Sequence, residues 1–382
     1  MVALDLDEMQ QMLQELAHQF ALDEIRPNAE YWDKESEYPL QAIKAADELG
    51  LLNLHIPEEY GGAGLGSMEE VVVTEELAWG DPGFATAAYA TSLAIAPIIT
   101  GGTEEQKQKW LRKVAEEGAL ASYCVTEPQA GSDVASIATT ATKDGVDYII
   151  NGEKMFITGA GYADFFFVLT KTDSAAGYKG MSGFVVESNA EGVSLGKKES
   201  NMGQRCSDTR SVIFNNVRVP ASQLIGGSES GGWMNAMNAF DMSRPNIAAQ
   251  ATGLARAAFE HALQYSDERE TFGQKLHQHQ AIQFMLADMK TKVEASRLLT
   301  WKSAALADAG QKNTEAAAHA KRFAADAAME VSTDAVQVFG GYGYSEEYPV
   351  ARLMRGAKVL QIYEGSSQVQ RMIIGREMLR GL

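Results

Sequence analysis

Cysteine, basic charge and long apolar runs are all scarce in this chain of 382 residues. Its two cysteines, Cys124 and Cys206, are too few for a disulfide framework and indicate a reducing compartment. Acidic side chains outnumber basic ones by 51 to 33, which leaves a net charge of −18 at pH 7. Because such a chain repels polyanions, we expect no nucleic-acid partner and no binding to anionic membranes.

No apolar run approaches the roughly 20 residues that span a bilayer, so we expect no integral membrane segment. The stretch 93–99 is apolar but far too short. The acidic start of the chain, residues 1–8, has neither the apolar core of a signal peptide nor the Arg-rich pattern of a transit peptide. These absences predict a soluble, cytoplasmic, bacterial protein.

The spacing of apolar residues divides the chain into three parts. Up to about residue 118 they recur three and four positions apart, as at Leu6, Met9 and Leu13, which predicts helices. Short apolar runs then alternate with turn signals such as Asn151-Gly152, which predicts antiparallel strands up to about residue 220. After the Gly- and Ser-rich stretch 226–232 the helical spacing returns.

Helices and strands are thus segregated along the chain, which is typical of an α+β multidomain protein and not of alternating βαβ units. We expect an N-terminal all-α domain at residues 1–118, a middle antiparallel, barrel-like β-domain at 119–232 and a C-terminal helical bundle at 233–382. The spacing of side chains also predicts two capping boxes at helix starts, Thr103 with Gln106 and Ser367 with Gln370.

Several familiar catalytic fingerprints are absent from the sequence. There is no GxGxxG turn after a predicted strand, no GxxxxGK[ST] loop, no HExxH and no GxSxG. His277 and His279 would point in different directions on a helix, so we expect no metal site. Both cysteines fit buried structural thiols better than nucleophiles.

Three segments nevertheless carry many functional groups. Residues 123–133 lead from a predicted strand into a loop of hydroxyls and carboxylates, a pattern that also suits a capped turn. Residues 269–273, followed by Gln280, include an arginine able to bind phosphate, although a lone arginine is usually solvated. The third segment, residues 337–371, contains Glu364.

Glu364 follows two bulky residues and precedes a glycine and a predicted helix start. In this apolar setting the pKa of its carboxyl should rise toward the range of a general base. The adjacent helix N-terminus offers N–H donors to a phosphate. The alternative is an ordinary acidic residue that complements the helix dipole.

Together these segments resemble the acyl-CoA dehydrogenase family. The likeness is carried by residues 124–133, 337–341 and 362–365, and it extends over essentially the whole chain. The blocks 201–210 and 361–368 are most similar to medium-chain or short/medium-chain members. The resemblance implies an N-terminal helical domain, a middle β-domain and a C-terminal four-helix bundle. It also implies non-covalently bound FAD and the oxidation of a fatty acyl-CoA to the trans-2-enoyl-CoA.

By this resemblance Glu364 is the base that removes the α-proton of the thioester, while the β-hydrogen leaves as hydride to flavin N5. The Glu364 backbone N–H and a ribityl hydroxyl of FAD would stabilise negative charge on the thioester oxygen. The family further implies electron-transferring flavoprotein as the electron acceptor and a homotetramer, with a dimer as the alternative.

The resemblance also assigns the binding residues one by one. The residues implied to contact FAD are Tyr123, Cys124, Val125, Thr126, Gly131, Ser132, Phe156, Ile157, Thr158, Arg269, Thr271, Phe272, His279, Gln280, Gln337, Val338, Gly340, Gly341, Ser366, Ser367 and Gln368. Among them, residues 337–341 would hold the adenylate half of FAD from a neighbouring subunit. The residues implied to contact the substrate are Ser132, Asp241, Arg244, Tyr363 and Gly365.

The chain departs from the family pattern at two of these positions. Phe156 stands where many medium-chain members have Trp, and Ser366 stands where Thr is usual. Some branches of the family, such as the isovaleryl type, carry the catalytic Glu at the helix position that is Ser243 here. Because this chain has Ser at that position and retains Glu364, the isovaleryl-type arrangement is disfavoured. An acyl-CoA oxidase or a flavin monooxygenase of the same superfold is the alternative function, and a non-catalytic helical scaffold is the least favoured. Chain-length preference stays open, since residues 93–99 fit either the border of the acyl tail or plain helix core.

Overall fold

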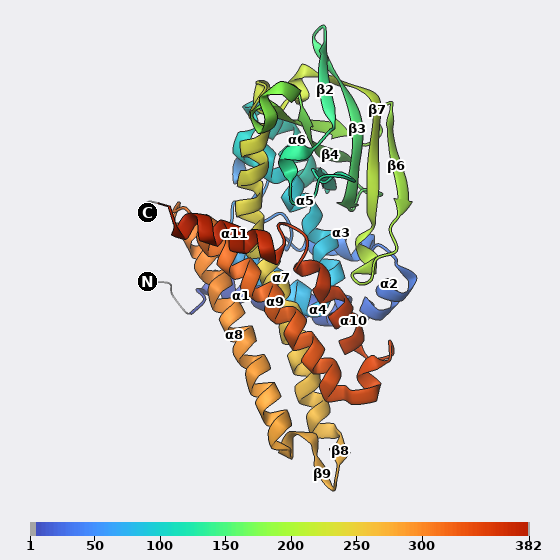
Figure 1. Cartoon of the computed structure of the whole chain (residues 1–382), viewed down its shortest axis with the longest axis vertical. Coiled ribbons are helices and arrows are strands. Elements are labelled where there is room, and N and C mark those ends of the chain that lie inside the picture. The colour runs from blue at the N-terminus through green and yellow to red at the C-terminus, as the bar shows by residue number, and fades with distance from the viewer. Residues whose placement is uncertain (1–4, 381–382) are drawn as a thin grey trace.

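The computed structural model describes residues 5–380 (Figure 1). A twisted sheet forms one end of the elongated molecule and long helices form the other, with the N-terminal helices packed against both. Residues 1–4 and 381–382 lie outside the described residues. The two ends of the predicted domains, and half of the stretch 1–8 in which no targeting signal was predicted, therefore also lie outside them.

The N-terminal part is helical, as predicted. Its helices are α1 (Glu8–Phe20), α2 (Ala29–Glu35), α3 (Leu40–Glu48), α4 (Ser67–Gly80), α5 (Pro82–Gly101) and α6 (Glu104–Glu117). The predicted capping box at the start of α6 is confirmed, since Thr103 Oγ1 accepts from the Gln106 N–H and the Gln106 side chain accepts from the Thr103 N–H.

Helix α5 corrects the prediction that no segment of the chain is long and apolar enough to span a bilayer. Within residues 5–380 it is the one helix long and apolar enough to span a membrane by length and composition, with a mean hydropathy of 1.4 over 18 residues. Its scattered Thr, Ser and Tyr residues interrupt the run and hid it from a search for continuous apolar sequence. However, 67% of that window is buried in the protein, where α5 packs on α7 and β1 as a core helix does.

The middle part is a single sheet whose strands are β1 (Ala121–Cys124), β2 (Thr140–Asp144), β3 (Asp147–Thr158), β4 (Phe165–Lys171), β5 (Met181–Glu187), β6 (Val193–Lys198) and β7 (Thr209–Pro220). The strand order is β1-β4-β2-β3-β7-β6, and β5 pairs with the free side of β4. Most pairings are antiparallel, as predicted, but β4 runs parallel to β1 and β2. The expected turn at Asn151-Gly152 lies inside β3, where a register shift makes it a β-bulge.

The C-terminal part is again helical. It comprises α7 (Gly232–Glu268), α8 (Gln280–Asp308), α9 (Thr314–Phe339), α10 (Pro349–Leu360) and α11 (Ser367–Met378), with the short hairpin β8 (Glu270–Thr271) and β9 (Gln274–Lys275) between α7 and α8. Helix α9 packs on α7, α8, α10 and α11. Its buried face is largely alanine, which allows its neighbours to approach closely.

Candidate active site

Glu364 lies in the connection between α10 and α11, here called the Glu364 turn (residues 361–366). Its backbone φ is 54° and that of Gly365 is 88°, so a non-glycine residue is held in the left-handed conformation. The side-chain amide of Gln370 donates to the carbonyl oxygens of Glu364 (3.3 Å) and Gly365 (3.0 Å). Lys321 Nζ also donates to the Gly365 carbonyl, at 2.7 Å. Strained backbone fixed in this way is typical of functional sites.

The N-terminus of α11 follows the turn directly. Ser366 is its N-cap, and Ser366 Oγ accepts a hydrogen bond from the Val369 N–H at 3.3 Å. The predicted capping box of Ser367 with Gln370 is therefore wrong by one residue. Ser367 is already helical and its hydroxyl donates to Asp326 on α9 at 2.7 Å, while Gln370 supports the Glu364 turn instead.

The Glu364 carboxylate is half-buried beside α7. Ser243 Oγ, on α7, donates a hydrogen bond to Glu364 Oε2. Burial raises the pKa of Glu364, whereas the Ser243 hydrogen bond and the charges of Lys321 and Arg244 act in the opposite direction. The net pKa lies above that of an exposed glutamate, which is the direction that a base working near neutral pH requires.

Lys321 is fully buried on α9, next to this carboxylate. Burial lowers the pKa of Lys321 to about 7, although the charge of Glu364 acts in the opposite direction. A buried amine is retained at a free-energy cost, so its contact with the Glu364 turn points to a role in that turn.

Four of the five predicted substrate contacts lie around Glu364. Tyr363 and Gly365 belong to the Glu364 turn itself. On α7, Arg244 Nη1 and Asp241 Oδ1 form an ion pair of 2.6 Å, and the charge of Glu364 acts on the pKa of Arg244. The fifth, Ser132, is exposed in a loop of the middle domain.

Helix α5 and the middle domain complete the surroundings of the turn. The hydroxyls of Tyr363 and Thr86 on α5 lie 3.2 Å apart, and the Tyr363 hydroxyl donates to Gln250 Oε1 on α7 at 3.2 Å. Tyr123 on β1 stacks on Phe167 at 4.9 Å between ring centroids. Burial raises the pKa of the Tyr123 phenol, and the charge of Glu364 adds to that shift, so the two groups are neighbours.

A buried ion pair anchors the loop that carries the predicted flavin contacts of the middle domain. Lys154 Nζ on β3 lies 2.8 Å from Glu127 Oε1, and both side chains are buried. The Glu127 carboxylate also accepts the backbone N–H groups of residues 138 and 139, at 2.5 and 3.0 Å. The pair thereby fixes the loop of residues 128–138, in which Gly131 and Ser132 are exposed.

Phe156 lies next to this loop in an irregular part of β3. Its φ is 59° and its side chain is 59% exposed, an unusual conformation and environment for an aromatic residue. The Met155 N–H donates to the Thr126 carbonyl at 2.8 Å, which joins the exit of β1 to this segment. Thr158, two residues further on, is half-buried. In contrast, the side chains of Cys124, Val125 and Ile157 are buried in apolar clusters, which leaves their backbone for any cofactor contact.

Gln368, another predicted FAD contact, is exposed in the first turn of α11. The other predicted FAD contacts lie at the end of the bundle that is opposite to the sheet (Figure 1). We call them the distal group: Arg269, Thr271, Phe272, His279, Gln280, Gln337, Val338, Gly340 and Gly341. The two sequence segments meet there, since the Arg269 guanidinium lies 5.9 Å from the ring centroid of Tyr342. Phe272 is 98% exposed with a φ of 51°, and Val338 is buried. Within one chain the distal group and Glu364 are not brought together.

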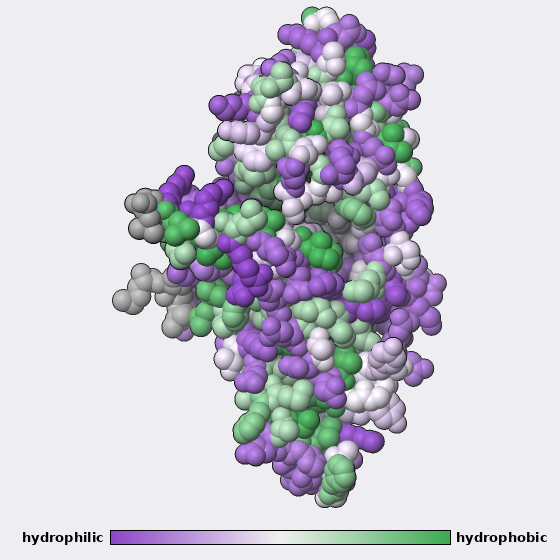
Figure 2. Space-filling view, viewed as in Figure 1, coloured by the Kyte–Doolittle hydropathy of each residue, from purple (hydrophilic) through white to green (hydrophobic). Residues whose placement is uncertain are grey.

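The space-filling view is hollowed between the sheet and α11, with hydrophobic residues at the rim (Figure 2). The Glu364 turn lies in this region of the ribbon view (Figure 1). Among residues 5–380, no three His, Cys, Asp or Glu side chains are clustered so that they could hold a metal ion.

Sequence reasoning assigned no site role to four residues that the structure makes prominent: Ser243, Lys321, Lys154 and Glu127. Ser243 and Lys321 are 121 and 43 positions away from Glu364, so no local pattern links them. One signal was present for Lys321, since it is a charged residue on the buried stripe of the Ala-rich helix α9.

Comparison with known proteins assigns nearly the whole chain to one family. Three family models match it, described as acyl-CoA dehydrogenase N-terminal domain (residues 7–118), middle domain (122–217) and C-terminal domain (230–379). The chain belongs to the acyl-CoA dehydrogenase family, which are oxidoreductases that oxidise acyl-CoA thioesters. The predicted fold class and family are thereby confirmed.

Individual relatives cover nearly the full length. A protein of Caenorhabditis briggsae described as a probable mitochondrial medium-chain specific acyl-CoA dehydrogenase is 43% identical, over 99% of this chain and 92% of its own length. The solved butyryl-CoA dehydrogenase of Megasphaera elsdenii is 42% identical with a TM-score of 0.96, over 99% and 100% of the two chains. A glutaryl-CoA dehydrogenase of Mycobacterium smegmatis, solved in complex with FADH2, is 29% identical with a TM-score of 0.92, over 98% and 95%.

Proposed function

We propose that this chain is an FAD-dependent acyl-CoA dehydrogenase that converts a fatty acyl-CoA to the trans-2-enoyl-CoA, with Glu364 as the base. The observation that carries the proposal is the half-buried Glu364 carboxylate, whose pKa is raised by desolvation on a strained turn that several side chains support. A carboxylate held in this way is oriented and poorly hydrated, so it can accept a proton from a weak carbon acid.

Two groups of the chain take part in the removal of the α-proton. The Glu364 carboxylate accepts it, and the Ser243 hydroxyl keeps Oε2 oriented toward the substrate. Proton removal from carbon also requires stabilisation of the charge that develops on the thioester oxygen. We assign this to the backbone N–H of Glu364; a donor of this kind contributes roughly 3–4 kcal/mol in other enzymes.

The residues present fit FAD. An exposed aromatic side chain at Phe156 offers a flat apolar surface, and Gly131 has no neighbouring atom within 4 Å of where a side chain would begin, so backbone can approach a ligand there. When bound, FAD would accept the β-hydrogen as hydride. The side of the fold that carries Phe156, Thr158 and Ser132 would hold its flavin end, and Ser366 to Gln368 at the start of α11 would contact phosphate.

The distal group supports a cofactor site shared between subunits. Arg269 is exposed, and Phe272 projects almost entirely into solvent in a conformation that a bulky residue rarely adopts. Both features fit residues that cover the adenylate half of FAD in a neighbouring copy, as the family resemblance implies. We therefore propose a homotetramer in which subunits share the FAD sites. From the family resemblance we also propose electron-transferring flavoprotein as the electron acceptor, and from the sequence a cytoplasmic location. We likewise propose domain limits at residues 118/119 and 232/233.

The proposal is tested with Glu364→Gln in the holoenzyme. We expect the variant to retain FAD and to bind acyl-CoA, but to lose several orders of magnitude in the rate at which butyryl- or octanoyl-CoA bleaches the oxidised flavin. Near-normal bleaching would overturn Glu364 as the base. Peroxide formed at the rate of substrate turnover would instead assign the chain to the acyl-CoA oxidases.

A further inference from the structure

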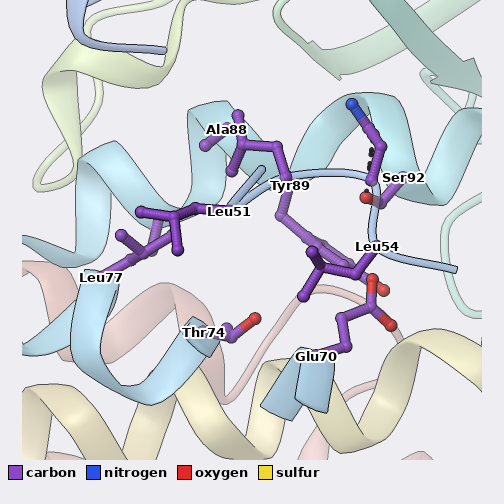
Figure 3. Close-up of a pocket in the computed structure, with 11 residues that line it drawn as sticks. Leu51, Leu54, Glu70, Thr74, Leu77, Ala88, Tyr89 and Ser92 are labelled. Carbon is purple, nitrogen blue, oxygen red and sulfur yellow. Dashed lines mark hydrogen bonds between the residues drawn. The ribbon is translucent and has the colours of Figure 1, made fainter. Parts of the chain in front are cut away.

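The packing around Glu364 is incomplete toward α4 and α5. A narrow pocket lies between these two helices and residues 51–54 of the connection that leads to α4 (Figure 3). Figure 3 shows the Tyr89 side chain extending from α5 across this pocket toward Glu70. Burial raises the pKa of Tyr89, and the charges of Glu70 and Glu364 add to this, so the phenol lies near both carboxylates. Because this side leaves space unfilled, it does not by itself fix the position of Glu364.

On the side of α9, the contacts to the Glu364 turn are polar and short. Asp326 Oδ1 accepts a hydrogen bond from Gln361 Nε2 at 2.8 Å and another from Ser367 Oγ at 2.7 Å. Lys321, five residues earlier on α9, donates to a carbonyl oxygen of the turn itself. Helix α9 therefore holds the turn at its first residue, near its middle and at the residue that directly follows it.

The two residues that meet at Asp326 also bind each other. The Ser367 N–H donates to the Gln361 carbonyl oxygen at 3.0 Å, which closes the turn into a ring. The side chains of the same two residues converge on one carboxylate oxygen of Asp326. Glu364 lies midway between them in the sequence, so its backbone cannot leave α9 unless these hydrogen bonds break.

The second oxygen of Asp326 lies against two arginines. Arg371 Nη2 donates to Asp326 Oδ2 at 2.8 Å, and Arg322 Nε lies 3.3 Å from the same oxygen. Burial acts to raise the pKa of Asp326, but the hydrogen bonds of the turn and the charges of the arginines outweigh it and lower the pKa. The carboxylate is therefore ionised at neutral pH, and the arginines keep Oδ1 directed toward the turn.

We infer that Asp326 is a positioning residue, which holds both ends of the Glu364 turn on α9 and so keeps the base within reach of the α-proton; this rests on the proposed function. Glu364 has a φ of 54°, and a non-glycine residue keeps this conformation only where its surroundings impose it. Proton removal also depends steeply on geometry, since a shift of about 1 Å can cost roughly 100-fold in rate. A turn whose ends are released relaxes and moves the carboxylate away from the substrate.

The test compares Asp326→Ala and Asp326→Asn with the wild-type holoenzyme on butyryl- or octanoyl-CoA. Asp326→Ala should lower kcat and the rate of flavin bleaching by about 10- to 100-fold. KM should change by less than about threefold, because the substrate still binds. Asp326→Asn has no charge but keeps an acceptor at Oδ1, while the two exposed arginines can turn to solvent, so it should recover most of kcat. An Asp326→Asn variant as slow as Asp326→Ala would assign the effect to the charge and overturn the inference.

A double-mutant cycle with Gln361→Ala tests whether Asp326 acts through the turn. Gln361→Ala removes one of the two hydrogen bonds to Oδ1 and should lower kcat on its own. The double variant should be no slower than Asp326→Ala, because both changes release the same contact. Fully additive losses would show that Asp326 acts by another route. Asp334→Ala, which removes a half-buried carboxylate eight residues further along α9, is the matched control and should leave kcat unchanged.

The remaining outcomes are also distinct. Rates are expressed per bound flavin, so that a loss of FAD is not counted as a loss of positioning. If Asp326→Ala fails to fold, Gln361→Ala decides, and a Gln361→Ala variant with the kcat of the wild type overturns the inference. Unchanged kcat in Asp326→Ala overturns it as well. A wild type that is inactive on every acyl-CoA would instead reject the proposed function.

Discussion

Lys321 Nζ on α9 lies 2.7 Å from the carbonyl oxygen of Gly365, the residue that follows Glu364. The contact joins a fully buried amine to the strained turn that carries Glu364, the proposed base. It gives the lysine two effects on Glu364: the hydrogen bond fixes the backbone, and the positive charge favours the ionised carboxylate.

Replacement of Lys321 by methionine should therefore separate activity from stability. We expect kcat to fall by about 10- to 100-fold, because a displaced base reacts poorly. The melting temperature should stay the same or rise, since methionine has a similar length and does not carry the free-energy cost of burying an amine. Lys312→Met, which removes an exposed lysine paired with Glu377, serves as the control. A Lys321→Met variant that loses stability and activity together would mean that the lysine is only structural.

Ser243→Ala should change the pH dependence of catalysis. Glu364 must be ionised to act as a base, so kcat/KM rises as the pH increases through its pKa. The Ser243 hydrogen bond lowers that pKa, and without it the acid limb of the profile should move to higher pH. On the acid limb we expect kcat/KM of Ser243→Ala to be roughly tenfold lower than that of the wild type.

The matched control for that experiment is Ser266→Ala. Ser266 lies on the same helix, is also buried, and donates to the backbone carbonyl of Leu263 at 2.7 Å. Its removal should leave the pH profile in place. An acid limb that does not move in Ser243→Ala would show that the hydroxyl does not act on Glu364.

The Lys154–Glu127 pair should be critical for the stability of the middle domain. Lys154→Met leaves an unpaired carboxylate in the interior and should destabilise the protein by about 3–5 kcal/mol. The double variant Lys154→Met/Glu127→Gln removes both charges but keeps an acceptor for the backbone N–H groups of residues 138–139, and should recover most of this loss. Thermal unfolding of the holoenzyme measures both, and equal stability of the single and double variants would contradict the ion-pair account.

The same pair predicts a loss of stability in acid. Burial acts to raise the pKa of Glu127, but Lys154 and the hydrogen bonds to the carboxylate outweigh it and lower the pKa to about 2. A carboxyl with a lowered pKa in the folded state stabilises the protein above its unfolded pKa of about 4.3, and this contribution is lost as the pH falls toward 2. Glu127→Gln should flatten the dependence of the melting temperature on pH between about 4.3 and 2.

Arg269→Ala should affect the retention of FAD more than the chemical step. The residue lies in the distal group, far along the bundle from Glu364, and its guanidinium is exposed for a phosphate. We expect a lower flavin content after gel filtration, with turnover largely restored by added FAD. Arg112→Ala removes an exposed arginine paired with Glu116 and serves as the control. Equal flavin content in the Arg269→Ala and wild-type proteins would count against a cofactor role.

Features that depend on residues close together in the sequence were predictable. The Thr103 capping box depends on side chains three positions apart. The direction of the Glu364 pKa shift was also predicted, but its cause is burial in the folded protein and not the two preceding residues alone, since Ile362 is 58% exposed. The Ser367 cap was placed one residue too late, because the left-handed Gly365 determines where α11 begins and a backbone dihedral is not visible in the sequence.

The sequence by itself determined the family and the helix–sheet–helix order and pointed to Glu364 as the candidate base, because these depend on local periodicity and on contiguous motifs. Only the tertiary structure decided which distant side chains surround that carboxylate: Ser243, Lys321 and Tyr123 come from three different elements. It also separated the distal group from Glu364, and it joined Asp326 of α9 to both ends of the Glu364 turn. Such contacts arise from how the helices pack, and the packing depends on the whole core rather than on any one segment.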